Sequence, residues 1–394
     1  MALAARTNDV PALTEALVRA PSPNPPGDER AAAAVVEAYL RDLPGVRCIT
    51  IAARPERPNL VFVLGSGRRT LALAAHVDTH PIVGDWTYRA TGERLDERLY
   101  GRGTTDNKGA VAAMAAVFRA AAEHSGILPG LRLVFIANAD EELGGADGIA
   151  VVLRELEEPL GAVVVAEPSG IDEPFEALYT AARGTSRFML TATGTRTHSS
   201  LAGRPAVPSA IERLDRALHS LERRVPALSA PHPQFGYTGR LSVVRLSGGE
   251  GYGVVPMTAS AELELRVTPG LTQETIERDV IAALQGEDVE LAFAESSLRW
   301  MAPSEIEMDH PLTRAAERAW LDVIGQQPER ACFPGGTDAR LFSEQGVPAL
   351  AGVGPGALVR AHHPDEYVTV AELDTATRLY AATVAHYASE RGTQ

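Results

Sequence analysis

The chain has 394 residues, with 37 Lys and Arg against 51 Asp and Glu, which gives a formal charge of −14. Its hydrophobic fraction of 45% and its charged fraction of 22% are those of an ordinary globular protein, and they exclude collagen-like, coiled-coil and wholly disordered chains. The negative charge also argues against nucleic acid and anionic membranes as partners.

Targeting signals and cysteine content indicate the compartment. No apolar run approaches the roughly 20 residues that are needed to cross a bilayer, and the first residues lack the pattern of a signal peptide. Two cysteines, Cys48 and Cys332, are too few for a disulfide framework or a thiolate metal cage. We therefore expect a cytoplasmic protein without a membrane partner.

The first part of the chain alternates helical patterns with short apolar runs. The expected helices lie at residues 13–20, 31–40 and 109–122, and the expected buried strands at 59–64, 70–75, 131–137 and 163–166. Strands rich in Leu, Val and Ile that alternate with helices predict an α/β fold with a mainly parallel sheet covered by helices on both faces.

The pattern changes near residue 179. Alternating strand patterns at 186–193, 241–246, 259–267 and 289–294 are interleaved with helical patterns at 207–224 and 272–284, the latter with Thr272 as its N-cap. The order β-α-β-β-α-β is that of a ferredoxin-like α+β unit. The α/β style then returns, with helices at 311–324 and 371–387 and a strand at 348–353. We expect residues 1–178 and 298–394 to form one domain, into which residues 179–297 are inserted.

Polar residues follow the predicted strands, at the ends where open α/β sheets place their ligand sites. His76 and Asp78 follow one strand, and a histidine with a carboxylate two residues away can act as a metal ligand with its orienting partner. Glu141, Glu142 and Glu167 follow the next two strands. Taken singly, each segment also fits a structural histidine or a solvated acidic turn.

A glycine-rich segment at 101–109 precedes the predicted helix at 109–122. Such a loop can cradle a phosphate, but the segment lacks the spacing of a P-loop, and Asp106 stands where a dinucleotide loop needs its third glycine. A carboxylate there repels a pyrophosphate and attracts a cation, so a metal is favoured over a nucleotide. A further pair of histidines, His362 and His363, lies near the C-terminus.

Residue types taken together predict a hydrolytic metal centre. Two histidines with Asp106, Glu142 and Glu167 form a mixed nitrogen and oxygen donor set that suits Zn²⁺, Co²⁺ or Mn²⁺. These five ligands suffice for two ions if one carboxylate bridges them. A spare glutamate beside a ligating one can accept a proton from an activated water, which describes hydrolysis.

The motifs together resemble the M20 metallopeptidase/deacylase family, above all its acetylornithine deacetylases and succinyl-diaminopimelate desuccinylases. The segments that carry the resemblance are His76-x-Asp78, Gly101-Arg-Gly103-x-x-Asp106-x-Lys108-Gly109, Glu141-Glu142-x-Gly144, Glu167-Pro168 and His362-x-Pro-Asp-Glu366.

The resemblance spans nearly the whole chain and implies a catalytic domain with an inserted lid, through which a homodimer forms. It implies that one metal ion binds His76 and Glu167, that the other binds Glu142 and His362, and that Asp106 bridges them. In such families the peptide after the bridging aspartate is often cis.

The resemblance also assigns proton transfer. It implies Glu141 as the general base and Asp78 as the partner of His76. Of the two adjacent histidines, His362 rather than His363 is the implied ligand, because the family's histidine lies four residues before a glutamate.

Substrate contacts are implied by the same resemblance. Arg183 and Arg266 match positions that bind a substrate carboxylate, although a surface salt bridge is the alternative for both. Gly336 and Thr337 match a loop that offers backbone N–H and hydroxyl donors. His198 matches a lid histidine that reaches the neighbouring subunit's site and stabilises the oxyanion.

The sequence thus predicts a zinc-dependent hydrolase of a linear amide bond, which removes the acyl group from an N-acyl amino acid. A dipeptidase or carboxypeptidase with the same centre, and a non-catalytic metal-binding dimer, are the alternatives. Gly253 stands where relatives often have Asn, which leaves the preference for acyl group and amino acid open.

Overall fold

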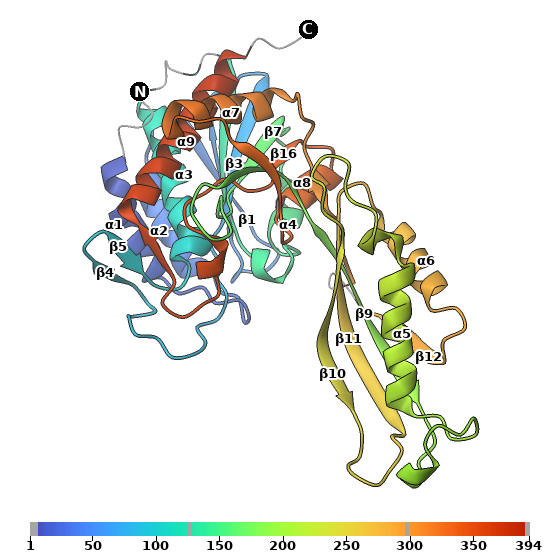
Figure 1. Cartoon of the computed structure of the whole chain (residues 1–394). Helices are drawn as coiled ribbons and strands as arrows, with labels where there is room; N and C mark the ends of the chain where they lie inside the picture. Colours follow the sequence, from blue (N-terminus) through green and yellow to red (C-terminus); the bar gives the residue numbers. More distant parts are fainter. Residues whose placement is uncertain (1–6, 125–127, 129, 296–298, 391–394) are drawn as a thin grey trace. The chain divides into compact units, whose positions relative to one another are not determined.

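The chain folds into two units in the computed structural model, which describes residues 7–124, 128, 130–295 and 299–390 (Figure 1). Unit 1 comprises Met1–Ala181, Ser304–Phe333 and Thr337–Gln394, and unit 2 comprises Ala182–Pro303 and Pro334–Gly336. The start of the insertion was expected at residue 179, and its expected end, between residues 297 and 298, falls outside the described residues.

Apolar strands form the central sheet of unit 1. The strand order is β1 (Val46–Ile51), β2 (Asn59–Leu64), β6 (Leu131–Asn138), β3 (Arg69–His76), β7 (Ala162–Val165) and β16 (Ala349–Leu350). The strands from β6 to β16 are parallel, whereas β1 and β2 pair antiparallel at one side. The mainly parallel sheet is thereby confirmed, although β1 was not expected.

The strand expected at 348–353 is shorter than predicted, because only Ala349–Leu350 form β16. The backbone N–H of Ala351 turns away to donate to Tyr179 O, while that of Val353 donates to Val165 O. The segment therefore divides its hydrogen bonds between two neighbours instead of extending one ladder.

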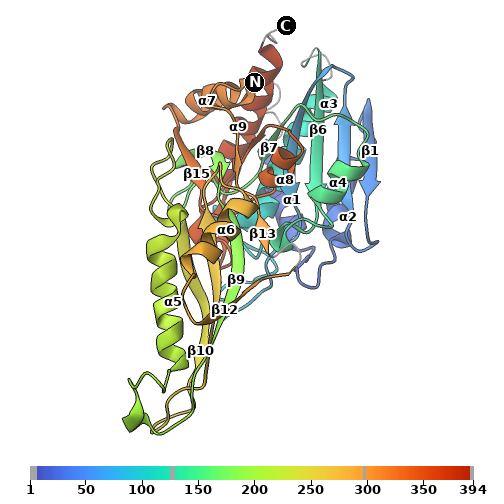
Figure 2. The ribbon, with the colours of Figure 1, turned by 90° about the vertical axis from the view of Figure 1, so that its right-hand side faces the viewer.

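Helices cover both faces of this sheet. They are α1 (Val10–Val18), α2 (Arg30–Leu40), α3 (Gly109–Glu123), α4 (Ile149–Glu155), α7 (Pro311–Ile324), α8 (Ala339–Glu344) and α9 (Val370–Ser389). Figure 1 shows α2 on one side of the sheet and α4 on the other, and Figure 2 looks onto the side that carries α4. The many alanines of α3 are buried and allow it to pack closely against β3 and β6. Burial of a ring such as Phe118 contributes roughly 1.5–3 kcal/mol to folding.

Two small sheets complete unit 1. One has the order β14 (Ser304–Glu305), β8 (Ala177–Ala182), β15 (Glu329–Phe333), and the other β17 (Tyr367–Thr369), β5 (Arg98–Tyr100), β4 (Glu93–Leu95). In the second sheet Tyr367 pairs with Tyr100. This pairing brings the segment before β17 beside the glycine-rich loop that follows β5.

Unit 2 is the ferredoxin-like element that the sequence predicts. Its elements in chain order are β9 (Gly184–Thr193), α5 (Ala210–Arg224), β10 (Arg240–Gly248), β11 (Thr258–Val267), α6 (Gln273–Ala283), β12 (Val289–Phe293) and β13 (Trp300–Met301). The antiparallel sheet has the order β10-β11-β9-β12, and β13 also pairs with β9. Thr272 caps α6 as expected, and Ser209 caps α5, so that helix begins after the expected residue 207.

No helix in the described ranges combines the length and the apolar character that a membrane span requires.

Candidate metal centre

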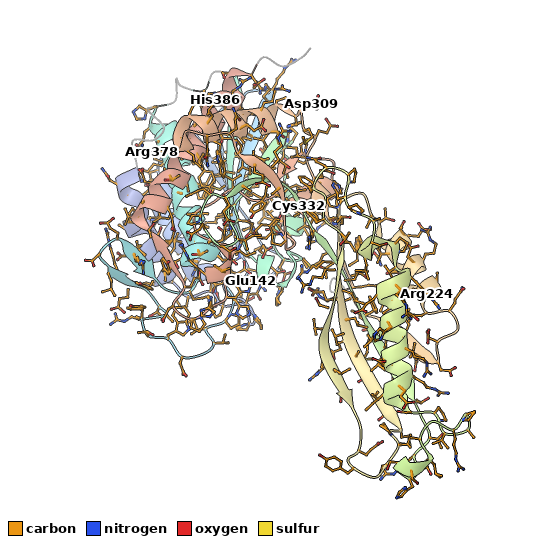
Figure 3. All side chains as sticks on the ribbon, viewed as in Figure 1. Glu142, Arg224, Asp309, Cys332, Arg378 and His386 are labelled. Atoms are coloured by element: carbon orange, nitrogen blue, oxygen red, sulfur yellow. The ribbon has the colours of Figure 1, made fainter. Side chains whose placement is uncertain are left out.

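The carboxyl ends of three neighbouring parallel strands carry most of the predicted ligands. His76 is the last residue of β3 and lies in register with Asn138 at the end of β6. Glu141 and Glu142 follow β6 in a short 3₁₀ turn, and Glu167 follows β7. Figure 3 labels Glu142 in unit 1. Strand order and direction thus place these side chains at one edge of the sheet.

Asp106 occupies the middle of the resulting cluster. It lies in the segment Thr104–Lys108 directly before α3, and its peptide bond to Asn107 is cis, as the resemblance implies. Its Oδ1 lies 3.0 Å from His76 Nε2, and its Oδ2 lies 3.3 Å from His362 Nε2. Each carboxylate oxygen of Asp106 therefore contacts a different imidazole.

Two groups of potential metal ligands share this aspartate. The first contains His76, Asp106 and Glu167, and the second contains Asp106, Glu142 and His362. Within each group the candidate ligand atoms lie within 4.8 Å of one another. The structure therefore brings together all the residues that the sequence proposed as ligands, in the two sets that the family resemblance implies.

Glu366 attaches the turn that carries His362 (residues 361–366) to the loop that carries Asp106 (residues 101–108). These two segments are called the His362 turn and the Asp106 loop. The Oε1 atom of Glu366 accepts hydrogen bonds from the backbone N–H groups of Gly103, Thr105 and Asp106 at 2.9–3.1 Å, and its Oε2 accepts a hydrogen bond from the side-chain Nη1 of Arg102 at 2.6 Å. Burial raises the pKa of Glu366 to about 7. Sequence reasoning used this glutamate only as a marker for His362, whereas the structure shows that it holds the loop in place.

Asp78 orients both His76 and the acidic turn. The Nδ1 atom of His76 lies 3.1 Å from the Asp78 backbone oxygen and 3.3 Å from its Oδ1. The Asp78 carboxylate also accepts the backbone N–H groups of Glu141 at 3.1 Å and Glu142 at 3.2 Å. Burial would lower the pKa of His76, but its hydrogen bonds to Asp106 and Asp78 raise that pKa well above its usual value.

Below Asp78 lies a buried polar network that sequence reasoning missed. Asn24 Nδ2 donates to Asp78 Oδ2 at 2.9 Å and to Asp140 Oδ1 at 3.1 Å. Arg57 donates to Asp140 Oδ1 at 2.7 Å and to Glu29 Oε2 at 2.8 Å. The Arg57 side chain is only 2% exposed, and an arginine in a proline-bounded loop gives no sequence signal of such burial.

Arg57→Met is expected to lower the free energy of unfolding by about 3–5 kcal/mol, because it leaves buried carboxylates without their cation. Burial raises the pKa of Glu29 to about 7, so urea denaturation is best measured at pH 8, where this carboxylate is charged. The matched control is Arg54→Met, since Arg54 pairs with Asp147 at the surface, where such pairs contribute about 0–1 kcal/mol. Equal losses in the two variants would contradict a stabilising role for the network.

The electrostatics of the cluster fit divalent cations. Burial and the negative charge of Asp106 raise the pKa of Glu167 well above its usual value, and burial does the same for Glu141. The Oε1 atom of Glu142 is buried without a hydrogen-bond partner in the part of the chain that the structure describes. Crowded carboxylates are costly unless cations neutralise them, and imidazole with carboxylate is a donor set for Zn²⁺.

Glu141 differs from its neighbours because it belongs to neither ligand group. Its backbone N–H is fixed by Asp78. Among the described residues its carboxylate makes no hydrogen bond or ion pair, so it is available to accept a proton.

Three predicted substrate-binding residues of unit 2 each contact a different kind of group. In unit 2, Arg266 pairs with Glu264 at 2.7 Å, and the Arg183 guanidinium lies 4.4 Å from the centre of the Tyr237 ring. His198, exposed and also in unit 2, has its Nδ1 2.9 Å from Ser200 Oγ. The alternative of a salt bridge is thus observed for Arg266.

The last two predicted contacts belong to one loop. Gly336 is part of unit 2, and a Cβ atom added to it would lie 3.0 Å from Met301 Cε. Thr337 is part of unit 1 and 1% exposed, and its Oγ1 accepts the backbone N–H of Ala339 at 3.3 Å. The Thr337 hydroxyl is therefore used within the fold.

This fold and this donor set are those of a metallohydrolase. Residues 72–386 match the sequence model of peptidase family M20/M25/M40. The chain belongs to this family and is a hydrolase that acts on amide bonds.

Curated relatives cover almost the full length. The chain is 30% identical over 387 residues to a succinyl-diaminopimelate desuccinylase of Rhodospirillum centenum, covering 94% of this chain and 95% of that protein. It is 28% identical over 346 residues to the enzyme of the same name from Beijerinckia indica, covering 84% and 86%.

Solved structures share the fold. An M20 family metallo-carboxypeptidase from Sulfolobus solfataricus, Sso-CP2, has a TM-score of 0.77 at 18% identity and covers 96% of this chain and 99% of that one. Human carnosine dipeptidase 1 has a TM-score of 0.71 at 20% identity, with 98% of both chains covered.

Proposed function

We propose that the protein is a metal-dependent deacylase, which hydrolyses the amide bond of an N-acyl amino acid with the help of two divalent ions, preferably Zn²⁺. The observation that carries this proposal is the Asp106 carboxylate, whose two oxygens contact different histidines and which belongs to both ligand groups. The names of the curated relatives, desuccinylases at 28–30% identity, support a deacylase over a peptidase.

The ligand assignment follows the two groups. His76 and Glu167 would hold one ion, Glu142 and His362 would hold the other, and Asp106 would contribute to both. When bound, such ions acidify a water molecule and polarise the carbonyl group of the substrate.

Glu141 performs the proton transfers in this proposal. Its carboxylate accepts the proton of the attacking water and then donates it to the nitrogen of the leaving amine. Burial raises the pKa of Glu141, which makes it a stronger base than an exposed glutamate. Asp78 keeps the base in position through the backbone N–H of Glu141.

Unit 2 acts as a lid and dimerisation element in this proposal. His198 stabilises the developing oxyanion, and Gly336 and Thr337 provide donors. Arg183 and Arg266 bind the substrate carboxylate, which for Arg266 requires that it exchanges its salt bridge with Glu264 for one with the substrate. The enzyme is a cytoplasmic homodimer that acts on small molecules of amino-acid metabolism.

A panel of substrates tests the proposal. Zinc-loaded enzyme is assayed on amino acids that carry acetyl, succinyl or longer N-acyl groups, and on dipeptides with matching side chains. The proposal expects the highest kcat/KM on an N-acyl amino acid. Faster cleavage of dipeptides would instead support the dipeptidase or carboxypeptidase alternative, which the names of the solved structures suggest.

Metal removal is expected to make stability depend on pH. Burial would lower the pKa of His362, but hydrogen bonds to Asp106 and Glu142 raise it to about 10. The stability that this shift contributes is complete below pH 6.5, the usual pKa of the group, and is lost as the pH rises toward 10. The raised pKa values of His76, Glu141 and Glu167 act in the same direction.

The melting temperatures of chelated and zinc-loaded protein are compared between pH 6 and pH 9. The ligands bind metal in their deprotonated forms. The zinc-loaded protein is therefore expected to keep most of the stability that the chelated protein loses as the pH rises. The gap between the two melting temperatures is therefore expected to widen with pH. A gap that stays constant or narrows would contradict the proposed ligand set.

A further inference from the structure

The two histidines of the cluster are held in different ways. The Nδ1 atom of His76 contacts Asp78, and its side chain is 2% exposed. The side chain of His362 is 46% exposed, and its backbone has a left-handed φ of 60°. Within the described ranges no acceptor contacts the Nδ1 atom of His362, although a metal-binding imidazole usually donates its second N–H to one.

A second imidazole takes the place of this missing partner. The ring of His80 stacks on the ring of His362, with a centroid distance of 4.4 Å and an interplanar angle of 22°. His80 is itself oriented, because its Nδ1 atom lies 3.1 Å from the backbone oxygen of Pro81. One face of the exposed His362 ring is thus covered by a partly buried ring.

The loop that begins at His80 is fixed to the His362 turn at further points. Asp365 Oδ1 accepts the backbone N–H groups of Thr87 at 2.8 Å and Tyr88 at 3.0 Å. Gly84 has a φ of 76°, and a Cβ atom there would lie 2.9 Å from Pro364 Cγ. These contacts keep the loop and the turn together, so the stacked rings are part of an ordered arrangement.

We propose that His80 is a positioning residue, which holds the His362 ring in its metal-binding orientation by stacking in place of the usual hydrogen bond at Nδ1. The proposal rests on the proposed function, because it assumes that His362 binds a metal ion. It distinguishes the two ions: the one held by Glu142 and His362 depends on His80, whereas the one held by His76 and Glu167 does not.

A titration with Co²⁺ tests the proposal without an activity assay. Chelated wild type, His80→Ala and His80→Phe are titrated with Co²⁺, and the visible absorption and the heat of binding give the number of ions and their dissociation constants. His80→Ala is expected to bind its first ion like wild type and its second at least about tenfold more weakly, which is the effect of losing an orienting partner. His80→Phe keeps a flat ring and is expected to restore the second site.

Controls separate positioning from other roles of the residue. His363→Ala removes an adjacent exposed imidazole, whose Nδ1 contacts the Pro364 backbone oxygen, and is expected to bind both ions normally. The metal-free melting temperature of His80→Ala is expected to lie within a few degrees of wild type, because only one stacked pair is lost. Tight binding of both ions by His80→Ala would overturn the proposal, and so would failure of His80→Phe to restore the second site, since an imidazole nitrogen would then be required. Wild type that binds only one Co²⁺ would contradict the two-ion centre itself.

Discussion

Glu141→Gln is expected to lower kcat by about 10²–10⁴-fold, the usual contribution of a general base. The substitution keeps the size of the side chain and the backbone N–H that Asp78 accepts, but it removes the proton acceptor. Because Glu141 belongs to neither ligand group, both ions are expected to bind as in wild type. Steady-state kinetics and metal analysis of the same preparation measure the two quantities.

The control for this variant is Glu157→Gln, an exposed glutamate between α4 and β7. It is expected to leave kcat and metal content unchanged. Near-normal turnover in Glu141→Gln would show that another group is the base. Loss of metal together with activity would instead place Glu141 among the ligands.

Asp106→Asn is expected to abolish activity and to weaken the binding of both ions. Asp106 is the only residue common to the two ligand groups, so its loss removes a ligand from each ion. Each dissociation constant is expected to rise by more than the roughly 10–100-fold that loss of an outer contact costs. Zinc titration and metal analysis measure this effect.

The same variant is expected to destabilise the metal-free chain. Burial would raise the pKa of Asp106, but hydrogen bonds from His362 and His76 lower it well below its usual range, so the carboxylate is charged. Removal of one partner from a buried ion pair costs about 3–5 kcal/mol. The exposed Asp172→Asn serves as the control. Asp106→Asn that keeps one ion at wild-type affinity would contradict the bridging assignment.

Elements with strong local patterns agree with the sequence prediction. Residues 60–64 form an uninterrupted apolar run and, with Asn59 before them, become β2, which is buried along its length. The helix at 311–324 starts with Pro311 in its first turn and ends before Gly325, whose φ is 88°. Both signals are local, and the rest of the fold does not override them.

Elements that depend on distant partners were missed. The three-residue strands β5 and β17 pair Tyr100 with Tyr367 across more than half of the chain. Segments of this length show no periodicity, so only the tertiary structure creates them. For the same reason the expected strand at 348–353 is shortened, since Ala351 bonds to Tyr179 instead of β7.

In the candidate site, too, residues with a local sequence signal were predicted, whereas residues that meet only in the folded chain were missed. The candidate metal ligands follow strand ends or lie in a recognisable motif, so the sequence predicts them. The supporting residues Asn24, Arg57 and Asp140 come from three distant segments and meet only in the folded chain.

Lys108, the only lysine of the chain, is 1% exposed, and its Nζ donates to the backbone oxygen of Ala20 at 2.8 Å. This contact links the start of α3 to the loop after α1.

The most direct test of this account is stepwise reconstitution of the chelated protein with Zn²⁺, with metal content and hydrolysis followed in the same samples. The substrates are the N-acyl amino acids and dipeptides of the panel. The account predicts no turnover without metal and an activity that rises with zinc content up to two ions per chain. Full turnover in the chelated protein, or no turnover on any of these amides after loading, would contradict it.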